Sequence, residues 1–166
     1  KAVEQSSKGI EDFRLDDGSR AMYSFFWDEL CDWYLEATKP VFQGGSPAEQ
    51  EETRRTLAHV IETALRALHP YMPFITEELW QRVPRPASRP QSIARAPYPT
   101  AEDGRLDEAA ERGMGALMAV VTAARSIRSE HDVHPGAAVP VALRTADAEL
   151  AASLQAQSQL IATLVK

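Results

Sequence analysis

The sequence predicts a mainly α protein, an antiparallel helix bundle followed by a small C-terminal α+β extension. Apolar residues recur at helical spacing over several long stretches, and a Ser-Pro-Ala-Glu motif at residues 46–49 is typical of a helix start. Eleven prolines divide the 166-residue chain between these stretches. With 44% hydrophobic and 25% charged residues, the chain has the composition of a globular domain that buries a core.

The first elements are expected to be two helices. Residues 1–15 have the pattern of a helix end, and Asp16 or Asp17 is expected to cap a second helix that runs to about Thr38, because an aspartate accepts hydrogen bonds from the free N–H groups of a first turn. Pro40 is expected to help end this helix before a turn at residues 43–45. Its apolar positions form one broad face: Tyr23, Phe26, Trp27, Leu30, Trp33, Tyr34 and Ala37.

The start of the third helix is the strongest local signal. Ser46 can cap the helix, Pro47 occupies the first turn where its missing N–H has no partner to lose, and Glu49 completes a capping box. This helix is expected to end at Pro70, and a short fourth helix is expected from Phe74 to about Val83. Within a bundle over residues 16–130, the side chains expected to be buried are Trp27, Leu30, Trp33, Leu65, Leu68 and Trp80.

The second half is predicted to be less uniform. Residues 84–100, with five prolines, predict an extended strap, and residues 102–130 predict one long helix. A turn at 134–136, a short strand at 139–143 and a last helix at 148–165 follow. Because a short strand is not stable alone, it docks on this domain or pairs with a segment beyond Lys166. The predicted domains are therefore 1–100, a helical bundle with its strap, and 101–166, a long helix with a truncated strand–helix extension.

Composition limits the possible functions. No apolar stretch approaches the ~20 residues that cross a bilayer, and the single cysteine fits a reducing cytoplasm. A chain that begins without methionine or a signal peptide is interpreted as part of a longer polypeptide. The net charge of -6 argues against a domain that holds nucleic acid by bulk positive charge. Residues 81–100 carry arginines and no acid, which predicts either an RNA-binding cluster or a solvated loop: Arg82, Arg85, Arg89 and Arg95.

The sequence offers no catalytic centre. It contains no glycine-rich phosphate loop, and no nucleophile–base combination can be assembled. His131 and His134 are three residues apart, but a third ligand is missing, so two solvated histidines are favoured over a metal site. We therefore expect no metal and no cofactor in this chain, and no catalysis by the chain alone.

Two segments resemble a known family. Residues 26–40 read FWDELCDWYLEATKP and residues 68–80 read LHPYMPFITEELW. Together they closely resemble the helical anticodon-binding domain of valyl-tRNA synthetases; the second segment is shared by class I synthetases for other aliphatic amino acids, whereas the Cys-Asp-Trp-Tyr core of the first resembles the valine enzyme. Residues 92–99 resemble the strap of that family, and residues 127–143 resemble the start of its C-terminal region.

The resemblance implies that this chain binds the anticodon stem-loop of valine tRNA. It also implies that the full-length protein is a cytoplasmic enzyme that joins valine to tRNA with ATP. The two ATP-site signatures of the family do not occur in this sequence, so the catalytic domain is expected elsewhere in the polypeptide. A contact helix of the family, with an Asn-…-Arg-Phe pattern, would lie upstream of Lys1. Two alternatives remain: another aliphatic synthetase such as the isoleucine enzyme, and a helical module that binds protein.

Four residues are candidate tRNA contacts. Leu35 lies in the valine-type segment, off the apolar face at 100° per residue, where an apolar side chain can pack against an unstacked base. Lys39 follows four residues later and can reach a phosphate. Packing of Leu35 against an absent helix or the catalytic domain is the competing hypothesis. Arg125 and Arg128 share one side of the long helix and either steer the tRNA backbone or pair with nearby acids such as Glu130 and Asp132.

Overall fold

The computed structural model describes residues 1–84, 89–100, 106–134 and 136–165, which belong to two compact units, Lys1–Asp103 and Gly104–Lys166. The mainly α fold class is confirmed, because the regular structure of both units is helical and the described residues contain no strand. No helix in the described ranges is long and apolar enough to span a bilayer.

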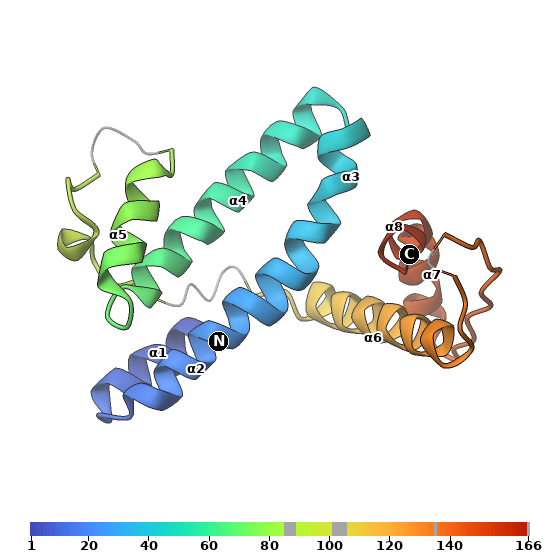
Figure 1. Cartoon of the computed structure of the whole chain (residues 1–166), viewed down its shortest axis with the longest axis horizontal. Coiled ribbons are helices and arrows are strands. Elements are labelled where there is room, and N and C mark those ends of the chain that lie inside the picture. Colours follow the sequence, from blue (N-terminus) through green and yellow to red (C-terminus); the bar gives the residue numbers. More distant parts are fainter. Residues whose placement is uncertain (85–88, 101–105, 135, 166) are drawn as a thin grey trace. The chain divides into compact units, whose positions relative to one another are not determined.

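The first unit begins with a tight helical hairpin of α1 (Ala2–Glu11) and α2 (Leu15–Ser24), shown in Figure 1. The two helices approach closely at glycines, since a Cβ built on Gly9 would lie 2.8 Å from the main-chain nitrogen of Gly18. The prediction that Asp16 or Asp17 caps α2 is wrong. The tight turn makes Arg14 the residue before the helix, and both aspartates lie in the first turn, where their charges favour the helix dipole.

A single continuous rod follows the hairpin. α2 passes without a break into a π-helix, η1 (Phe25–Leu35), and then into α3 (Glu36–Gly44). The prediction that Pro40 helps end this helix near Thr38 is wrong, because Pro40 lies inside α3. The winding changes from π to α just before Pro40, and such changes are where a helix accommodates a missing hydrogen bond. Of the turn expected at residues 43–45, the first two residues are helical, and α3 ends at Gly44 with Gly45 as its cap.

The chain then reverses into α4 (Pro47–Leu68), which contacts α3 and α2 of the rod and packs against α5 (Pro73–Arg82) (Figure 1). The predicted capping box is confirmed. The Ser46 hydroxyl accepts from the main-chain N–H of Glu49 at 3.3 Å, and the Glu49 carboxylate accepts from the Ser46 N–H at 2.8 Å. These two hydrogen bonds fix the start of α4 and therefore the bend between α3 and α4.

The core of this unit forms where α2, α4 and α5 meet the strap. One cluster joins Met22 to Ala67 and Leu68, and a second joins Leu65 to Trp80 and Ile93, a residue of the short 3-10 helix η2 (Ile93–Arg95) in the strap. The burial predicted for Leu30, Leu65, Leu68 and Trp80 is confirmed. The predicted burial of Trp27 is wrong, since its side chain is 55% exposed, and Trp33 is only half-buried. Both lie in the π-helix, whose wider turns invalidate a face assigned at 3.6 residues per turn.

The second unit consists of α6 (Glu108–Glu130), α7 (Ala148–Ala156) and α8 (Ser158–Leu164). Leu117, Val121 and Ala124 of α6 are buried, as are Leu154, Ile161 and Leu164 of the shorter helices. α6 starts after its cap, Asp107, later than the predicted residue 102, and residues 101–105 lie outside the described residues. The predicted last helix is split at Gln157.

The strand predicted at residues 139–143 is not formed among the described residues, and its pairing with a segment beyond Lys166 stays a prediction. These residues have no regular secondary structure, because among the described residues no other segment pairs with them and an isolated strand gains no ladder of hydrogen bonds. Of the turn predicted at 134–136, Pro135 lies outside the described residues. The His134 carbonyl accepts from the Ala137 N–H at 2.9 Å, which closes the turn.

Candidate nucleic-acid interface

Lys39 is an exposed residue of α3 near the end of the rod. Its ammonium lies 2.6 Å from the carboxylate of Glu36, one helical turn earlier, and both side chains remain solvated. An exposed ion pair of this kind stabilises a protein by at most about 1 kcal/mol. Exchanging the carboxylate for another anion, such as a phosphate, therefore costs little.

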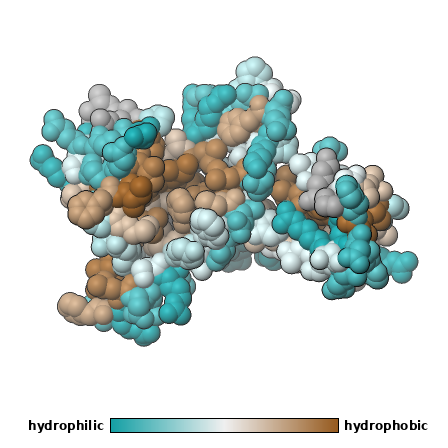
Figure 2. All heavy atoms as spheres, in the orientation of Figure 1, coloured by the Kyte–Doolittle hydropathy of each residue, from teal (hydrophilic) through white to brown (hydrophobic). Residues whose placement is uncertain are grey.

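Leu35 ends the π-helix and lines an apolar groove of about 330 Å³. The groove lies between η1 and α5 and has α4 as its floor, where Figure 2 shows hydrophobic residues gathered on the surface of this unit. The expected position of Leu35 off the core face is corrected, because Leu35 lines this groove together with Leu30, Ile61 and Leu65. A leucine here supplies packing area but no hydrogen bond, so it can hold a base without reading its edge.

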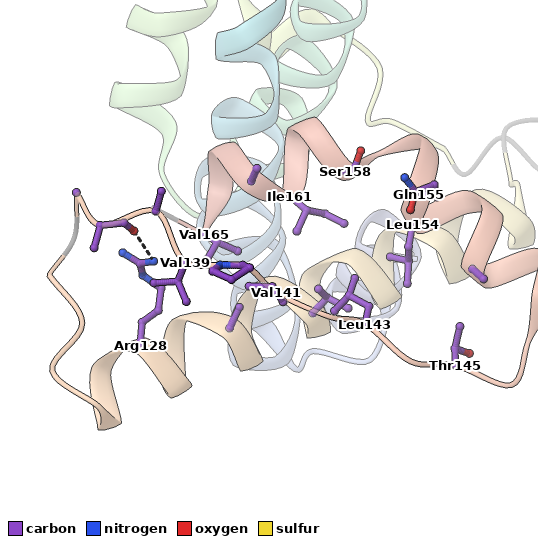
Figure 3. A pocket seen from close by; sticks show the side chains of 18 residues that line it. Arg128, Val139, Val141, Leu143, Thr145, Leu154, Gln155, Ser158, Ile161 and Val165 are labelled. Carbon is purple, nitrogen blue, oxygen red and sulfur yellow. Dashed lines mark hydrogen bonds between the residues drawn. The ribbon is translucent and has the colours of Figure 1, made fainter.

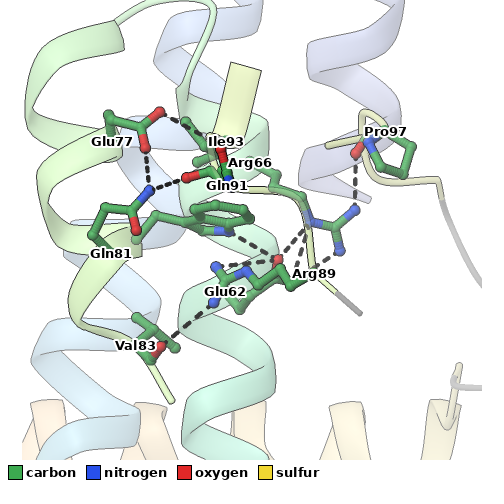
Figure 4. A network of polar contacts seen from close by, with 10 residues as sticks. Glu62, Arg66, Glu77, Gln81, Val83, Arg89, Gln91, Ile93 and Pro97 are labelled. Atoms are coloured by element: carbon green, nitrogen blue, oxygen red, sulfur yellow. Dashed lines mark hydrogen bonds and ion pairs between the residues drawn. The ribbon is translucent and has the colours of Figure 1, made fainter. Parts of the chain in front are cut away.

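The strap is fixed to the helices by a buried cluster around Glu62 of α4 (Figure 4). Arg89, whose side chain is only 6% exposed, lies over the ring of Trp80 at 3.4 Å from its centroid and 3.6 Å from the Glu62 carboxylate. The same carboxylate accepts from Trp80 Nε1 at 3.0 Å and from Arg66 Nε at 2.9 Å. Arg66 in turn donates to the Pro97 carbonyl at 2.9 Å, so Glu62 organises both ends of the strap.

A second group holds the middle of the strap through Glu77 of α5. Its carboxylate accepts from the Ser92 hydroxyl at 2.7 Å. It also accepts from the Ile93 N–H at 3.0 Å (Figure 4). Hydrogen bonds from Gln81 and Ser92 lower the pKa of Glu77 below its ordinary value, against a smaller opposing effect of burial. The tyrosine of the strap, Tyr98, lies 2.6 Å from the Ser6 hydroxyl, and burial raises the pKa of its phenol.

These contacts decide the role of the arginines in residues 81–100. Arg89 is buried, and Arg82 pairs with Glu78 at 2.5 Å. Arg95 is exposed, and Arg85 lies outside the described residues. Neither predicted alternative, an RNA-binding cluster or a solvated loop, describes Arg89, which fixes the strap to the helices instead.

Arg125 and Arg128 organise the second unit. Arg125 donates through Nε and Nη2 to the Leu164 carbonyl at 2.9 and 2.7 Å, at the C-terminal end of α8 where a positive charge favours the helix dipole. Arg128 donates to the carbonyls of Ala137 and His134 at 3.0 and 2.9 Å. Both arginines therefore hold main-chain carbonyl groups of this unit.

The described residues provide no metal site of three or more His, Cys, Asp or Glu side chains. Cys31 is half-buried in the apolar groove.

Comparison with known families identifies the family of this helical domain. The family model described as the anticodon-binding domain of tRNA ligase matches residues 1–143, which include all of α1 to α6. The chain belongs to this family. The resemblance inferred from residues 26–40 and 68–80 is confirmed, and an anticodon-binding domain accounts for the helical architecture.

Two relatives of this anticodon-binding domain are named valine–tRNA ligase. The protein from Chromobacterium violaceum is 43% identical over 147 residues, covering 87% of this chain and 16% of the relative. The protein from Dechloromonas aromatica is 44% identical over 164 residues, covering 95% of this chain and 17% of the relative. The chain thus spans about a sixth of the length of either relative.

Of the four candidate contacts in this anticodon-binding domain, the structure brings Leu35 and Lys39 together on one rod and Arg125 and Arg128 together on α6. Sequence reasoning missed the Glu62 cluster. The one available signal was the spacing of Glu62 and Arg66, which stand four residues apart on a predicted helix and so lie on the same face. Nothing in the sequence indicated that Arg89, 27 positions after Glu62, packs on Trp80.

Proposed function

We propose that this chain is the tRNA-binding module of a valine–tRNA ligase, which holds the anticodon stem-loop of valine tRNA while a catalytic domain elsewhere in the polypeptide charges the tRNA with valine and ATP. The observation that carries the proposal is the family match over residues 1–143 combined with relatives named valine–tRNA ligase at 43–44% identity. The named relatives also favour the valine enzyme over the isoleucine enzyme.

Leu35 and Lys39 are the proposed contacts to the anticodon loop. Lys39 carries an exposed ammonium in a weak ion pair, and Leu35 lines an open apolar groove about one helical turn away. An unstacked base packs against apolar surface while a neighbouring phosphate pairs with a lysine, which is how single-stranded nucleic acid is commonly held. Because the groove is apolar, we expect Leu35 to contribute affinity more than base identity.

Arg125 and Arg128 are proposed to act at longer range. Their guanidinium groups are positively charged and donate to main-chain carbonyl oxygens, so they can attract a polyanion without leaving those partners. In a chain with a net charge of -6, such local positive charge steers a polyanion toward one surface. This steering is screened by salt, unlike apolar packing.

The proposal is tested by the binding of the chain to valine tRNA, isoleucine tRNA and duplex RNA across a series of salt concentrations. A valine-specific module binds valine tRNA most tightly and weakens as salt rises, because phosphate contacts release counterions. Preference for isoleucine tRNA supports the isoleucine enzyme, and equal weak binding to all three RNAs supports the protein-binding module. Charging of valine tRNA by the full-length protein tests the activity itself.

The contact residues are tested in the full-length protein by Leu35→Ala and Lys39→Ala. Leu15→Ala and Lys8→Ala are matched controls on the α1–α2 hairpin, and Leu15 is itself 56% exposed. Leu35→Ala should lower charging efficiency by about 1–3 kcal/mol in transition-state terms, with valine activation by ATP intact. Lys39→Ala should lower the salt dependence of binding by about one counterion. Losses equal to those of the controls would refute the two contacts.

Arg125 and Arg128 require a different comparison, because each also holds the second unit together. Replacement by lysine keeps the charge and removes most of the carbonyl hydrogen bonds. If the arginines act by steering, Arg128→Lys keeps the association rate at low salt, whereas Arg128→Gln lowers it. A lower melting temperature in both variants with unchanged association rates would assign Arg128 a purely structural role.

A further inference from the structure

A cavity of about 810 Å³ lies inside the second unit (Figure 3). Its walls are α6, α7, α8 and the segment of residues 137–145 that connects α6 to α7, and most of the lining is apolar. In Figure 3 the connecting segment runs in an extended path beside α6, with the labelled side chains of Val139, Val141 and Leu143 along it. The helices and this segment therefore enclose more space than their own side chains fill.

The side chains alternate in the second half of this segment. Residues 136–141 all line the cavity, and beyond them Leu143 and Thr145 line it whereas Ala142 and Arg144 do not. An alternation of this kind is the geometry of a β-strand, in which every second side chain points to the same face. Yet Val139, Val141 and Leu143 are 48%, 59% and 48% exposed, so the apolar face is only partly covered.

The main-chain hydrogen bonds of the segment are also incomplete. In the described part of the protein, the N–H and C=O groups of residues 138–144 make no hydrogen bond to the rest of the chain. In a strand, the N–H and C=O of one residue point to one edge and those of the next residue to the opposite edge. Pro140 has no N–H, which breaks the edge formed by the even-numbered residues. The edge of Val139, Val141 and Leu143 keeps all its donors and acceptors.

Both ends of the segment are held in place. At the start, Arg128 donates to the Ala137 carbonyl at 3.0 Å (Figure 3). At the end, the Thr145 hydroxyl accepts from the Asp147 N–H at 3.1 Å, and Asp147 caps α7. The segment is thus fixed beside the helices with one intact hydrogen-bonding edge and one apolar face.

We propose that residues 138–144 are an edge strand completed by a second strand, which pairs with the main chain of Val139, Val141 and Leu143 and covers the cavity with its own apolar side chains. An extended polypeptide is the occupant that satisfies both features, because it supplies main-chain partners and alternate side chains together. The even-numbered edge, interrupted by Pro140, faces solvent.

The second strand is assigned to the same polypeptide. This assignment rests on the proposed function, in which the full-length protein is a valine–tRNA ligase. The residues matched to this chain account for only 16% and 17% of the two relatives, so most of such a polypeptide lies outside this chain. A tethered strand meets its partner at a high effective concentration, whereas a separate chain must first associate. Intramolecular pairing is therefore favoured over pairing between copies.

Hydrogen exchange tests the proposal residue by residue in the full-length protein and in the 166-residue chain. In the full-length protein, the amides of Val139, Val141 and Leu143 should exchange at least about tenfold more slowly than those of Ala138, Ala142 and Arg144. In the 166-residue chain all six should exchange rapidly. Equal rates at both edges in the full-length protein would overturn the pairing. Protection in the shorter chain that grows with concentration would assign the occupant to a second copy and overturn the intramolecular strand.

A pair of proline variants gives a matched control. Val141→Pro removes an N–H from the intact edge, and Ala142→Pro removes one from the edge that Pro140 already interrupts. Val141→Pro should abolish the protection of Val139 and Leu143, and Ala142→Pro should preserve it; Val141→Ala, which keeps the N–H, should preserve it as well. The readout needs no tRNA, so a failure of this proposal is distinguishable from a failure to charge valine tRNA.

Discussion

Replacing Glu62 by glutamine removes the charge that joins α4, α5 and the strap. The glutamine keeps one acceptor for Trp80 Nε1 and loses the ion pairs with Arg66 and Arg89. Breaking a fully buried pair costs about 3–5 kcal/mol, mainly because the remaining charge is left buried. The Glu62 and Arg66 side chains are 22% and 20% exposed, so water screens part of this cost. We expect Glu62→Gln to lower the free energy of unfolding by about 2–3 kcal/mol.

Urea unfolding followed by tryptophan fluorescence measures this loss in the first unit alone, because all three tryptophans, Trp27, Trp33 and Trp80, lie in that unit. Arg89→Met supplies the second arm of a double-mutant cycle, since methionine keeps an apolar stem over Trp80. The double variant should lose less stability than the sum of the single variants, because it also removes the buried Arg89 charge that Glu62→Gln deprives of its carboxylate. Additive losses, or a loss below about 0.5 kcal/mol for Glu62→Gln, would refute the proposed coupling of strap and helices.

Three further predictions follow from burial, close packing and protonation. Trp80→Ala should destabilise the first unit by about 3–5 kcal/mol, because the Trp80 side chain is fully buried. Trp27→Ala should destabilise it by less than about 1 kcal/mol, because the Trp27 side chain is 55% exposed. Equal losses in urea unfolding would contradict the π-helical placement of Trp27. Gly9→Ala should lower the thermal midpoint through an overpacking cost of about 1–3 kcal/mol, while Gly44→Ala, whose added Cβ meets nothing within 4 Å, should not. The pKa of Glu77 in the folded protein lies below its ordinary value, so its contribution to stability is present above about pH 4.5 and is lost as pH falls through the lower folded pKa. The free energy of unfolding, measured at several pH values, should therefore depend less on acid in Glu77→Gln. An unchanged pH profile would exclude this contribution.

Local rules predicted the elements whose signals lie within one helical turn. The capping box at Ser46 and the proline in the first turn of α4 act over three or four residues, and the structure confirms them. The rod from α2 to α3 departs from the prediction at Pro40 and Trp27, because both were placed by the geometry of a regular α-helix. The π-helix between Phe25 and Leu35 changes that geometry.

The candidate tRNA contacts show the same division. The valine-type motif at residues 26–40 indicated the family, and the family comparison confirmed it. Whether Leu35 faces a groove, and whether Arg125 and Arg128 hold carbonyl oxygens, depends on segments far away in the sequence. Their proposed contacts with tRNA are therefore questions for the charging and binding experiments.

By itself, the sequence determined the helical class, the helix start at Ser46 and the family, because periodic burial, capping and a family motif are written in neighbouring residues. Only the tertiary structure decided that Arg89 is buried over Trp80 beside Glu62 and that Leu35 lines a groove. It also decided that residues 138–144 pair with no other segment of the described residues. The physical reason is that burial, ion pairing and strand pairing depend on which distant segments meet. A local pattern describes one side of such a contact, and the fold supplies the other.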